Sequence, residues 1–106
     1  MTFHPTENPE FWKETAASCF ESGRYEKAAE AYLRITEMTP NDFEAWLGRG
    51  KSLFFLEKYG DAVSVLERCL VLSPDNKDAL KFLADAFGKL ESNEKRASCI
   101  LRMNDL

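Results

Sequence analysis

Apolar residues recur along this 106-residue chain at the spacing of an amphipathic α-helix. Trp12, Ala16 and Cys19, for example, follow one another at i, i+4 and i+7, which places them on one face of a helix. Similar patterns follow along the rest of the chain, separated by short polar turns. The pattern predicts six helices, at about residues 9–22, 25–38, 43–56, 59–72, 77–90 and 94–102.

Capping and turn residues mark the ends of these helices. Asn8 is followed by proline, and this pair is typical of a helix start. Gly23 stands where the first helix should end, as glycine commonly does just past a C-terminus. Either Asn41 or Asp42 caps the third helix. Glu44 follows Asn41 at the spacing of a capping box.

The predicted helices repeat in pairs. Residues of the same type recur about 34 positions apart, a period that indicates stacked helix–turn–helix units. The matched pairs are Trp12 and Trp46, Tyr25 and Tyr59, Ala28 and Ala62, and Pro40 and Pro74. We therefore divide the chain into a lead-in, residues 1–8, and one domain, residues 9–106, with units at about 9–42, 43–76 and 77–106.

These residues resemble the tetratricopeptide repeat pattern, and the resemblance covers almost the whole chain from about Pro9 onward. It implies an all-α fold, a right-handed α-solenoid of three stacked units in which the third is atypical. It is specific for architecture but says little about function, because repeat scaffolds bind many unrelated partners. The residues that carry it are Trp12, Gly23, Tyr25, Ala28, Tyr32 and Pro40, then Trp46, Gly50, Ala62 and Pro74, and more weakly Leu80, Leu83, Ala84 and Phe87.

The second helix of the third unit departs from the pattern. Counted strictly by one period, Arg96 replaces the small alanine of the earlier units. A shift of one residue would bring Ala97 to that position, but it would place Asn104 where an apolar residue is expected. Ile100 and Met103 support the unshifted register, and both registers stay open. We expect this last helix to be short.

Family members commonly end with an additional solvating helix, and none follows the third unit here. Three explanations stay open. The chain is a piece of a larger protein, or the last helix is itself the cap, or the chain self-associates through that helix into a homo-oligomer. The apolar residues near the end of the chain that support self-association are Leu101, Met103 and Leu106.

Composition excludes several classes of protein. The net charge of −4 disfavours a nucleic-acid binder, which normally presents a basic face. No apolar run approaches the roughly 20 residues that span a bilayer, so no membrane is expected, and the polar N-terminus does not resemble a secretory signal. The odd number of cysteines, Cys19, Cys69 and Cys99, indicates core thiols in a reducing cytoplasm.

Catalytic residues are nearly absent from the sequence. His4 is the only histidine, so no motif with two histidine ligands for a metal exists. The chain also lacks the glycine-rich loops that hold phosphates. Its many carboxylates fit solvated helix faces. We therefore expect no enzyme activity, no metal and no cofactor.

The resemblance implies a concave groove along the first helix of each unit, which takes a peptide or helix from a partner protein. We expect Phe20, Leu47 and Phe54 to supply apolar anchors there. We also expect one of Phe54 and Phe55 to be core, and we place Phe54 in the groove. Lysines between the anchors would engage acidic groups of the partner. The full set of predicted groove residues is Lys13, Phe20, Leu47, Lys51, Phe54, Lys81 and Asp85.

Some tetratricopeptide domains clamp the C-terminal carboxylate of heat-shock chaperones with two Lys, two Asn and an Arg. Only Lys13 matches, because the other four positions are Ala17, Gly48, Asp78 and Phe82. The sequence therefore predicts a non-enzymatic interaction module with a different peptide ligand. The alternatives are a self-assembling scaffold that associates through the uncapped last unit and, far less favoured by the charge, an RNA-binding helical repeat.

Overall fold

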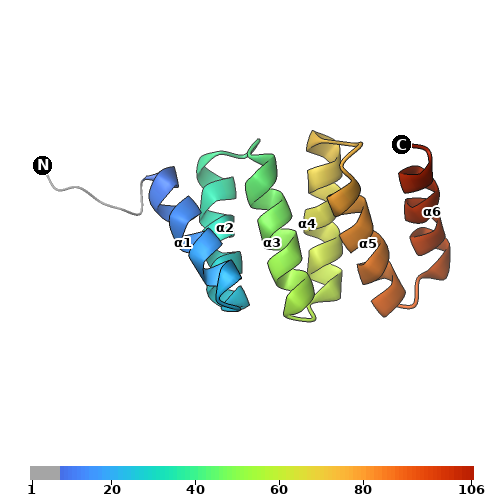
Figure 1. The fold of residues 1–106 in the computed structure, drawn as a ribbon, viewed down its shortest axis with the longest axis horizontal. Coiled ribbons are helices and arrows are strands. Elements are labelled where there is room, and N and C mark those ends of the chain that lie inside the picture. The colour runs from blue at the N-terminus through green and yellow to red at the C-terminus, as the bar shows by residue number, and fades with distance from the viewer. Residues whose placement is uncertain (1–7) are drawn as a thin grey trace, which may run out of the picture.

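The computed structural model describes residues 8–106, which form six α-helices and no strand within that range. They are α1 (Pro9–Glu21), α2 (Tyr25–Met38), α3 (Phe43–Phe55), α4 (Tyr59–Leu72), α5 (Lys77–Lys89) and α6 (Asn93–Asn104). The helices stand side by side in one elongated row, from α1 at one end to α6 at the other (Figure 1). The expected lead-in, apart from Asn8, and His4 lie outside the described residues.

The predicted bounds of the first five helices agree with the structure to within one residue. The last helix is longer than the predicted range 94–102, because α6 continues to Asn104, although it is still the shortest of the six described helices. Two contacts hold its last turn. The Arg102 guanidinium donates a hydrogen bond of 3.2 Å to the carbonyl of Pro74, and Met103 packs against the core.

Polar side chains cap the first helix of each unit. A side-chain oxygen of Asn8, Asp42 and Asn76 accepts a hydrogen bond from a backbone amide in the first turn, at 3.0, 3.2 and 2.9 Å respectively. The expected capping box between Asn41 and Glu44 is wrong. Asp42 is the cap, so Glu44 is the second residue of the helix and not the third, which the reciprocal bond requires.

The turns inside the units settle the register of the third one. Gly23, Glu57 and Glu91 have φ angles of 79°, 62° and 60°, and each follows the previous one by one period. Two of these left-handed positions therefore carry glutamate where the first unit has glycine. Because Glu91 keeps the period, the unshifted register is confirmed, and Arg96 occupies the position of Ala62.

Small residues let the two helices of each unit approach closely. Ala28 on α2 and Ala62 on α4 are fully buried against their partner helices. On α3, a Cβ atom at Gly50 would lie 2.7 Å from Cδ2 of Leu66 on α4. The predicted reason for a glycine inside this helix, close packing against the paired helix, is thus confirmed.

The buried residues form two clusters. The larger one spans α3 to α6 and contains aliphatic side chains such as Leu53, Leu66 and Leu80. The smaller one joins α1, α2 and α3, and it consists of Ala16, Ala31, Ile35 and Ala45. The two tryptophans that mark the period are both partly buried, Trp12 against the smaller cluster and Trp46 against the larger.

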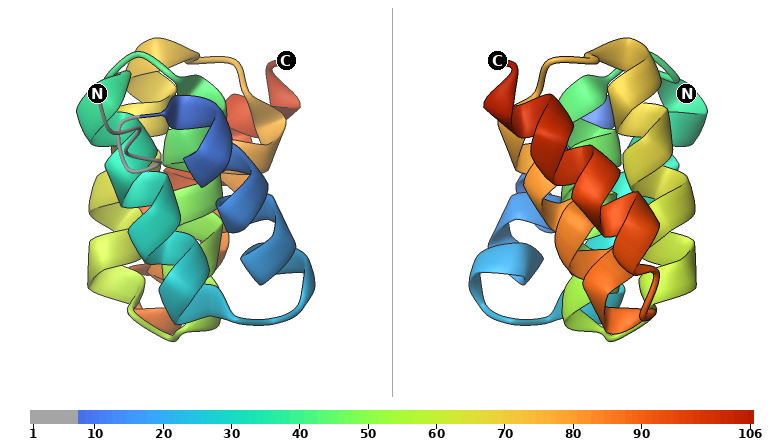
Figure 2. Two further views of the ribbon diagram at one scale, coloured as in Figure 1. Left: turned by 90° about the vertical axis from the view of Figure 1, so that its left-hand side faces the viewer. Right: turned by 90° about the vertical axis from the view of Figure 1, so that its right-hand side faces the viewer.

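The first helices of the three units lie along one side of the stack. Besides its neighbours in sequence, α3 contacts both α1 and α5, and no contact of similar extent joins α2 to α4 or α4 to α6. An end view shows α1 on one side of the molecule and α2 and α4 on the other (Figure 2). We call the surface carried by α1, α3 and α5 the inner face.

The left-handed turns generate a stability prediction. Replacing Glu57 with glycine (Glu57→Gly) should raise the free energy of unfolding by about 1 kcal/mol, because an L-residue loses roughly 1–2 kcal/mol in this conformation and glycine recovers most of it. Gly23→Ala should lower it by a similar amount through the backbone alone, since a Cβ at Gly23 meets no atom within 4 Å. Urea unfolding measures both. Glu57→Ala is the control. An equal rise in its free energy of unfolding would show that the gain does not come from the freedom of glycine to adopt the left-handed conformation.

The three cysteines should differ in reactivity. Burial raises the pKa of Cys69 to about 12 and also raises the pKa of Cys99, whereas Cys19 is only half-buried. Because the thiolate is the reactive form, a thiol reagent at neutral pH should modify Cys19 first. In a Cys19→Ser variant, Cys69 and Cys99 should be labelled only when the protein unfolds, and mass spectrometry can measure this labelling. Rapid labelling of that folded variant would show that the core opens.

Candidate functional site

The inner face carries most of the predicted groove residues at its surface. Lys13, Lys81 and Asp85 are exposed, and Phe20, Lys51 and Phe54 are partly exposed. Leu47 is different, because only 6% of it is exposed and it belongs to the larger core cluster. It lies on α3, which is flanked by both α1 and α5. Leu47 therefore does not project from the inner face as an anchor.

Six aromatic side chains form a continuous cluster that links all three units. The rings of Tyr25 and Phe55 are stacked with centroids 5.0 Å apart, and those of Phe54 and Phe82 meet edge to face at 5.4 Å. Such pairs add to the stability gained from burial alone. We call this set, which comes from the first five helices, the aromatic cluster: Phe20, Tyr25, Phe54, Phe55, Tyr59 and Phe82.

The expectation that one of Phe54 and Phe55 belongs to the core is wrong, because neither side chain is fully buried. Phe54 packs against the larger core cluster, whereas Phe55 is 45% exposed. Phe55 is therefore the aromatic side chain that this part of α3 offers to solvent. Phe54 meets the rings of Tyr59 on α4 and Phe82 on α5, and Phe55 also contacts Phe82.

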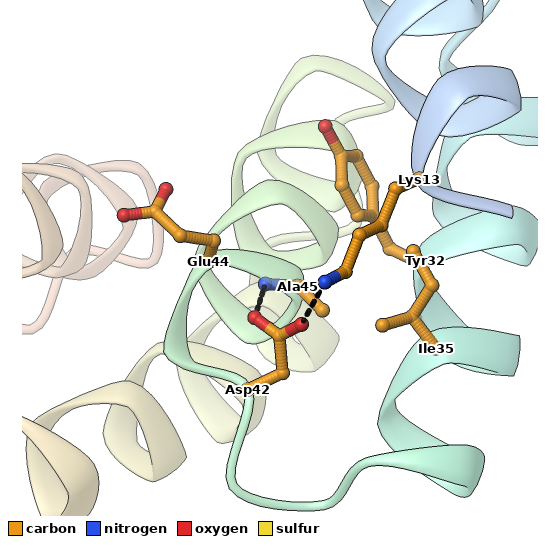
Figure 3. Close-up of a pocket in the computed structure, with 6 residues that line it drawn as sticks. All are labelled: Lys13, Tyr32, Ile35, Asp42, Glu44 and Ala45. Atoms are coloured by element: carbon orange, nitrogen blue, oxygen red, sulfur yellow. Dashed lines mark hydrogen bonds and ion pairs between the residues drawn. The ribbon is translucent and has the colours of Figure 1, made fainter. Parts of the chain in front are cut away.

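A cavity of about 310 Å³ lies between α1, α2 and the start of α3, where Lys13 and Tyr32 line it together (Figure 3). The Lys13 ammonium is 3.6 Å from a carboxylate oxygen of Asp42, whose other oxygen caps α3 (Figure 3). Glu44 points away from this ion pair in the same view. Lys13 is thus already partly neutralised by its own chain.

A second cavity, of about 110 Å³, adjoins the first, because Tyr32 and Glu44 line both. Phe20, Leu47 and Lys51, three of the predicted residues, meet here. The Tyr32 ring lies directly over Gly48, since a Cβ at Gly48 would overlap it. Burial raises the pKa of Tyr32, and the carboxylates of Glu44 and Glu21 raise it further.

Lys51 connects this cavity to the aromatic cluster. Its ammonium lies 5.4 Å from the centre of the Phe82 ring and 3.9 Å from a carboxylate oxygen of Asp78. A cation over an aromatic ring is attracted to the face of that ring. The ammonium is therefore held beside apolar surface, as a mixed apolar and acidic ligand would require.

A third cavity, of about 410 Å³, lies toward the C-terminal end of the inner face and contains the predicted residues Phe54 and Asp85. Sequence reasoning missed three contributors to these cavities and to the cluster. From the sequence, Tyr32 is marked only as part of the repeat pattern, Phe82 only as a non-matching position of the carboxylate clamp, and Arg96 only as a departure from the repeat. The sequence did give a signal for Arg96, because this large cation stands one period after the small residue Ala62.

Residues 8–106 contain no group of three or more His, Cys, Asp or Glu side chains placed to hold a metal. Among the helices of that part of the chain, none combines the length and apolarity needed to cross a bilayer. What the inner face offers is a row of aromatic and cationic side chains between shallow cavities, which suits binding a chain of mixed character.

A model of the tetratricopeptide repeat family matches residues 9–52 and again residues 43–86. The chain belongs to the tetratricopeptide repeat family. The fold of this family is a protein–protein interaction fold. The matched ranges cover most of the described helices, and both include the start of α3.

Relatives of known sequence cover parts of this tetratricopeptide repeat chain. A repeat-containing protein of Methanocaldococcus jannaschii is 33% identical over 67 residues, which is 63% of this chain and 12% of that protein. The peroxisomal targeting signal receptor of Pichia angusta is 36% identical over 75 residues, 70% of this chain and 13% of the receptor. The chain thus spans about an eighth of the length of each of these two relatives.

Solved structures confirm the helical repeat fold. MamA MSR-1 superposes with a TM-score of 0.88 over 93% of this chain and 57% of its own, at 17% identity. The Arabidopsis OM64 tetratricopeptide domain superposes with a TM-score of 0.86 over 94% of this chain and 83% of its own, at 15% identity. At such identities the likeness concerns the fold alone.

Proposed function

We propose that this chain is a non-enzymatic interaction module that binds a peptide segment of a partner protein along its inner face. The observation that carries this proposal is the aromatic cluster. It joins three units, and it leaves Phe55 45% exposed at its centre. Aromatic residues, including phenylalanine, are enriched in protein interfaces relative to the rest of the surface.

The segment would lie along α1, α3 and α5, with an apolar residue against Phe55 and polar groups near Lys51. A short segment held in this way binds with micromolar affinity, or roughly −8 kcal/mol. No catalytic step is included, and we place the protein in the cytoplasm. The buried neutral thiols of Cys69 and Cys99 support a reducing compartment.

Substitutions on the inner face should weaken peptide binding. The probe is a peptide selected from a random library displayed on phage, then synthesised and titrated by fluorescence anisotropy. Phe55→Ala should raise its Kd by about tenfold or more, because a truncated anchor residue costs at least about 1–2 kcal/mol. Lys51→Glu should weaken binding of any acidic peptide, since it reverses a charge that lies beside Phe82.

Val71→Ala is the matched control, because it also truncates an exposed apolar side chain, 68% exposed, but on α4. Its Kd should equal that of the unmodified protein, and circular dichroism should show equal helicity in all variants. A Val71→Ala effect as large as that of Phe55→Ala would move the site off the inner face. Failure to select any binding peptide would contradict the proposed function itself.

As a second function we propose that the chain self-associates through α6. The supporting observation is that large apolar side chains remain exposed on or beside this last helix, at 36% for Ile100, 63% for Leu101 and 48% for Leu106. In an interior unit the next helix would cover the equivalent surface, as α3 covers α2. A second copy of the chain could do the same.

Light scattering over a range of concentrations tests this second function. The mean mass should rise with concentration in the unmodified chain, because buried apolar area drives the association. Leu101→Glu should hold the mass at that of one chain, while Leu33→Glu on α2 serves as the control at another partly exposed leucine. A constant single-chain mass at high concentration would exclude self-association.

A further inference from the structure

The third unit departs from the first two at two positions that face each other. Gly88 on α5 stands one period after Phe54, and Arg96 on α6 stands one period after Ala62. A Cβ atom at Gly88 would lie 3.3 Å from Cδ of Arg96, so the arginine stem runs across the glycine. The smaller side chain at Gly88 on α5 is thus matched by the larger side chain at Arg96 on α6.

A cavity with charged side chains in its lining lies at this exchange. The third cavity of the inner face, about 410 Å³, is lined by Phe54, Asp85, Gly88, Lys89 and Arg96. We call it the Arg96 pocket. The aromatic ring at Phe54 belongs both to this pocket and to the aromatic cluster, so the pocket continues the surface already assigned to the peptide.

The cations of the Arg96 pocket differ from the other lysines that face the cavities. Lys13 and Lys51 are each within 4.0 Å of a carboxylate of their own chain. Neither Lys89 nor Arg96 forms an ion pair with any residue in 8–106. Among residues 8–106, Asp85 is the single carboxylate in the lining, so two cations face one anion there.

We propose that the Arg96 pocket binds the side-chain carboxylate of an aspartate or glutamate in the partner segment. This assignment rests on the inner-face binding proposed above and specifies its ligand. The planar guanidinium of Arg96 matches a carboxylate with two parallel hydrogen bonds, and Lys89 adds a second positive charge. Gly88 lets the Arg96 stem pass close to the backbone of α5, because no side chain of α5 stands there.

The position of the pocket also predicts which type of peptide residue lies near the acidic one. The Phe54 and Phe55 rings are 5.8 Å apart, so an apolar residue on the aromatic cluster lies one short step from the pocket. Residues i and i+2 of an extended chain point the same way and are about 7 Å apart. The recognised pattern is therefore an acidic residue and an aromatic or aliphatic residue separated by one position.

An acidic side chain fits the pocket better than a C-terminal carboxylate. A terminal carboxylate brings a backbone amide with it, and no asparagine or glutamine from the described part of the chain lines this pocket to bind that amide. Asp85 sets the strength of the site, since its charge opposes a bound carboxylate. Removing the charge of Arg96 should therefore weaken the binding of an acidic peptide, whereas removing the charge of Asp85 should strengthen it.

The test selects peptides of about 12 residues, roughly 40 Å when extended, from a random phage library in which the displayed C-terminus is not free. Acidic residues should be enriched one position from an apolar residue. For the selected peptide, made with an amidated C-terminus, Arg96→Ala should raise Kd about tenfold or more, the loss of a charge-assisted hydrogen bond. Asp85→Asn should lower Kd by about twofold to threefold.

Arg96→Ala is expected to fold, because alanine occupies the same position on α2 and α4. Arg34→Ala, which removes an exposed arginine from α2, is the matched control and should leave Kd unchanged. Enrichment of basic residues with the two effects reversed in sign, or binding that requires a free terminal carboxylate, would overturn the proposal. Selected peptides without acidic residues would overturn this pocket alone, whereas the absence of any binding peptide would count against the inner face as a whole.

Discussion

The close approach of paired helices is the constraint on which this structure depends. Ala28 and Ala62 have no exposed surface, and Gly50 leaves no room for a methyl group beside Leu66. A larger side chain at such a contact would cost about 1–3 kcal/mol and push the helices apart. Because α3 must contact α4 on one side and α1 and α5 on the other, that separation would also break the line of first helices that forms the inner face.

The sequence predicted the fold closely because each helix buries one stripe, and a stripe is visible in a single segment. The details that it missed depend on neighbouring segments. Asn41 and Asp42 are equally good caps by type, and only the path of the chain decides between them. Glu57 and Glu91 have left-handed backbone conformations. Because neither residue is a glycine, the sequence at these positions does not predict that conformation. The same turns resolve the register of α6, which residue types alone left open.

The candidate site was predictable only in part. A helical wheel places Lys13, Phe20 and Asp85 on one side of the first helices, and they do lie on the inner face. Whether a side chain on the inner face is exposed to solvent depends on the helices that flank its own helix. A wheel therefore gives no signal for the burial of Leu47 or the exposure of Phe55. Cavities formed by two units, such as the one where Tyr32 overlies Gly48, are also beyond any single-helix pattern.

The two core clusters differ in a way that bears on motion. The cluster under α1 and α2 contains three alanines and one isoleucine, whereas the cluster from α3 to α6 holds many large aliphatic side chains. Less apolar area means a smaller free energy of local opening, and in a stacked repeat each unit is held mainly by its neighbours. The first unit should therefore open locally at a lower free energy than the other two. A peptide bound along α1, α3 and α5 would then lose its contacts with α1 more readily than those with α5.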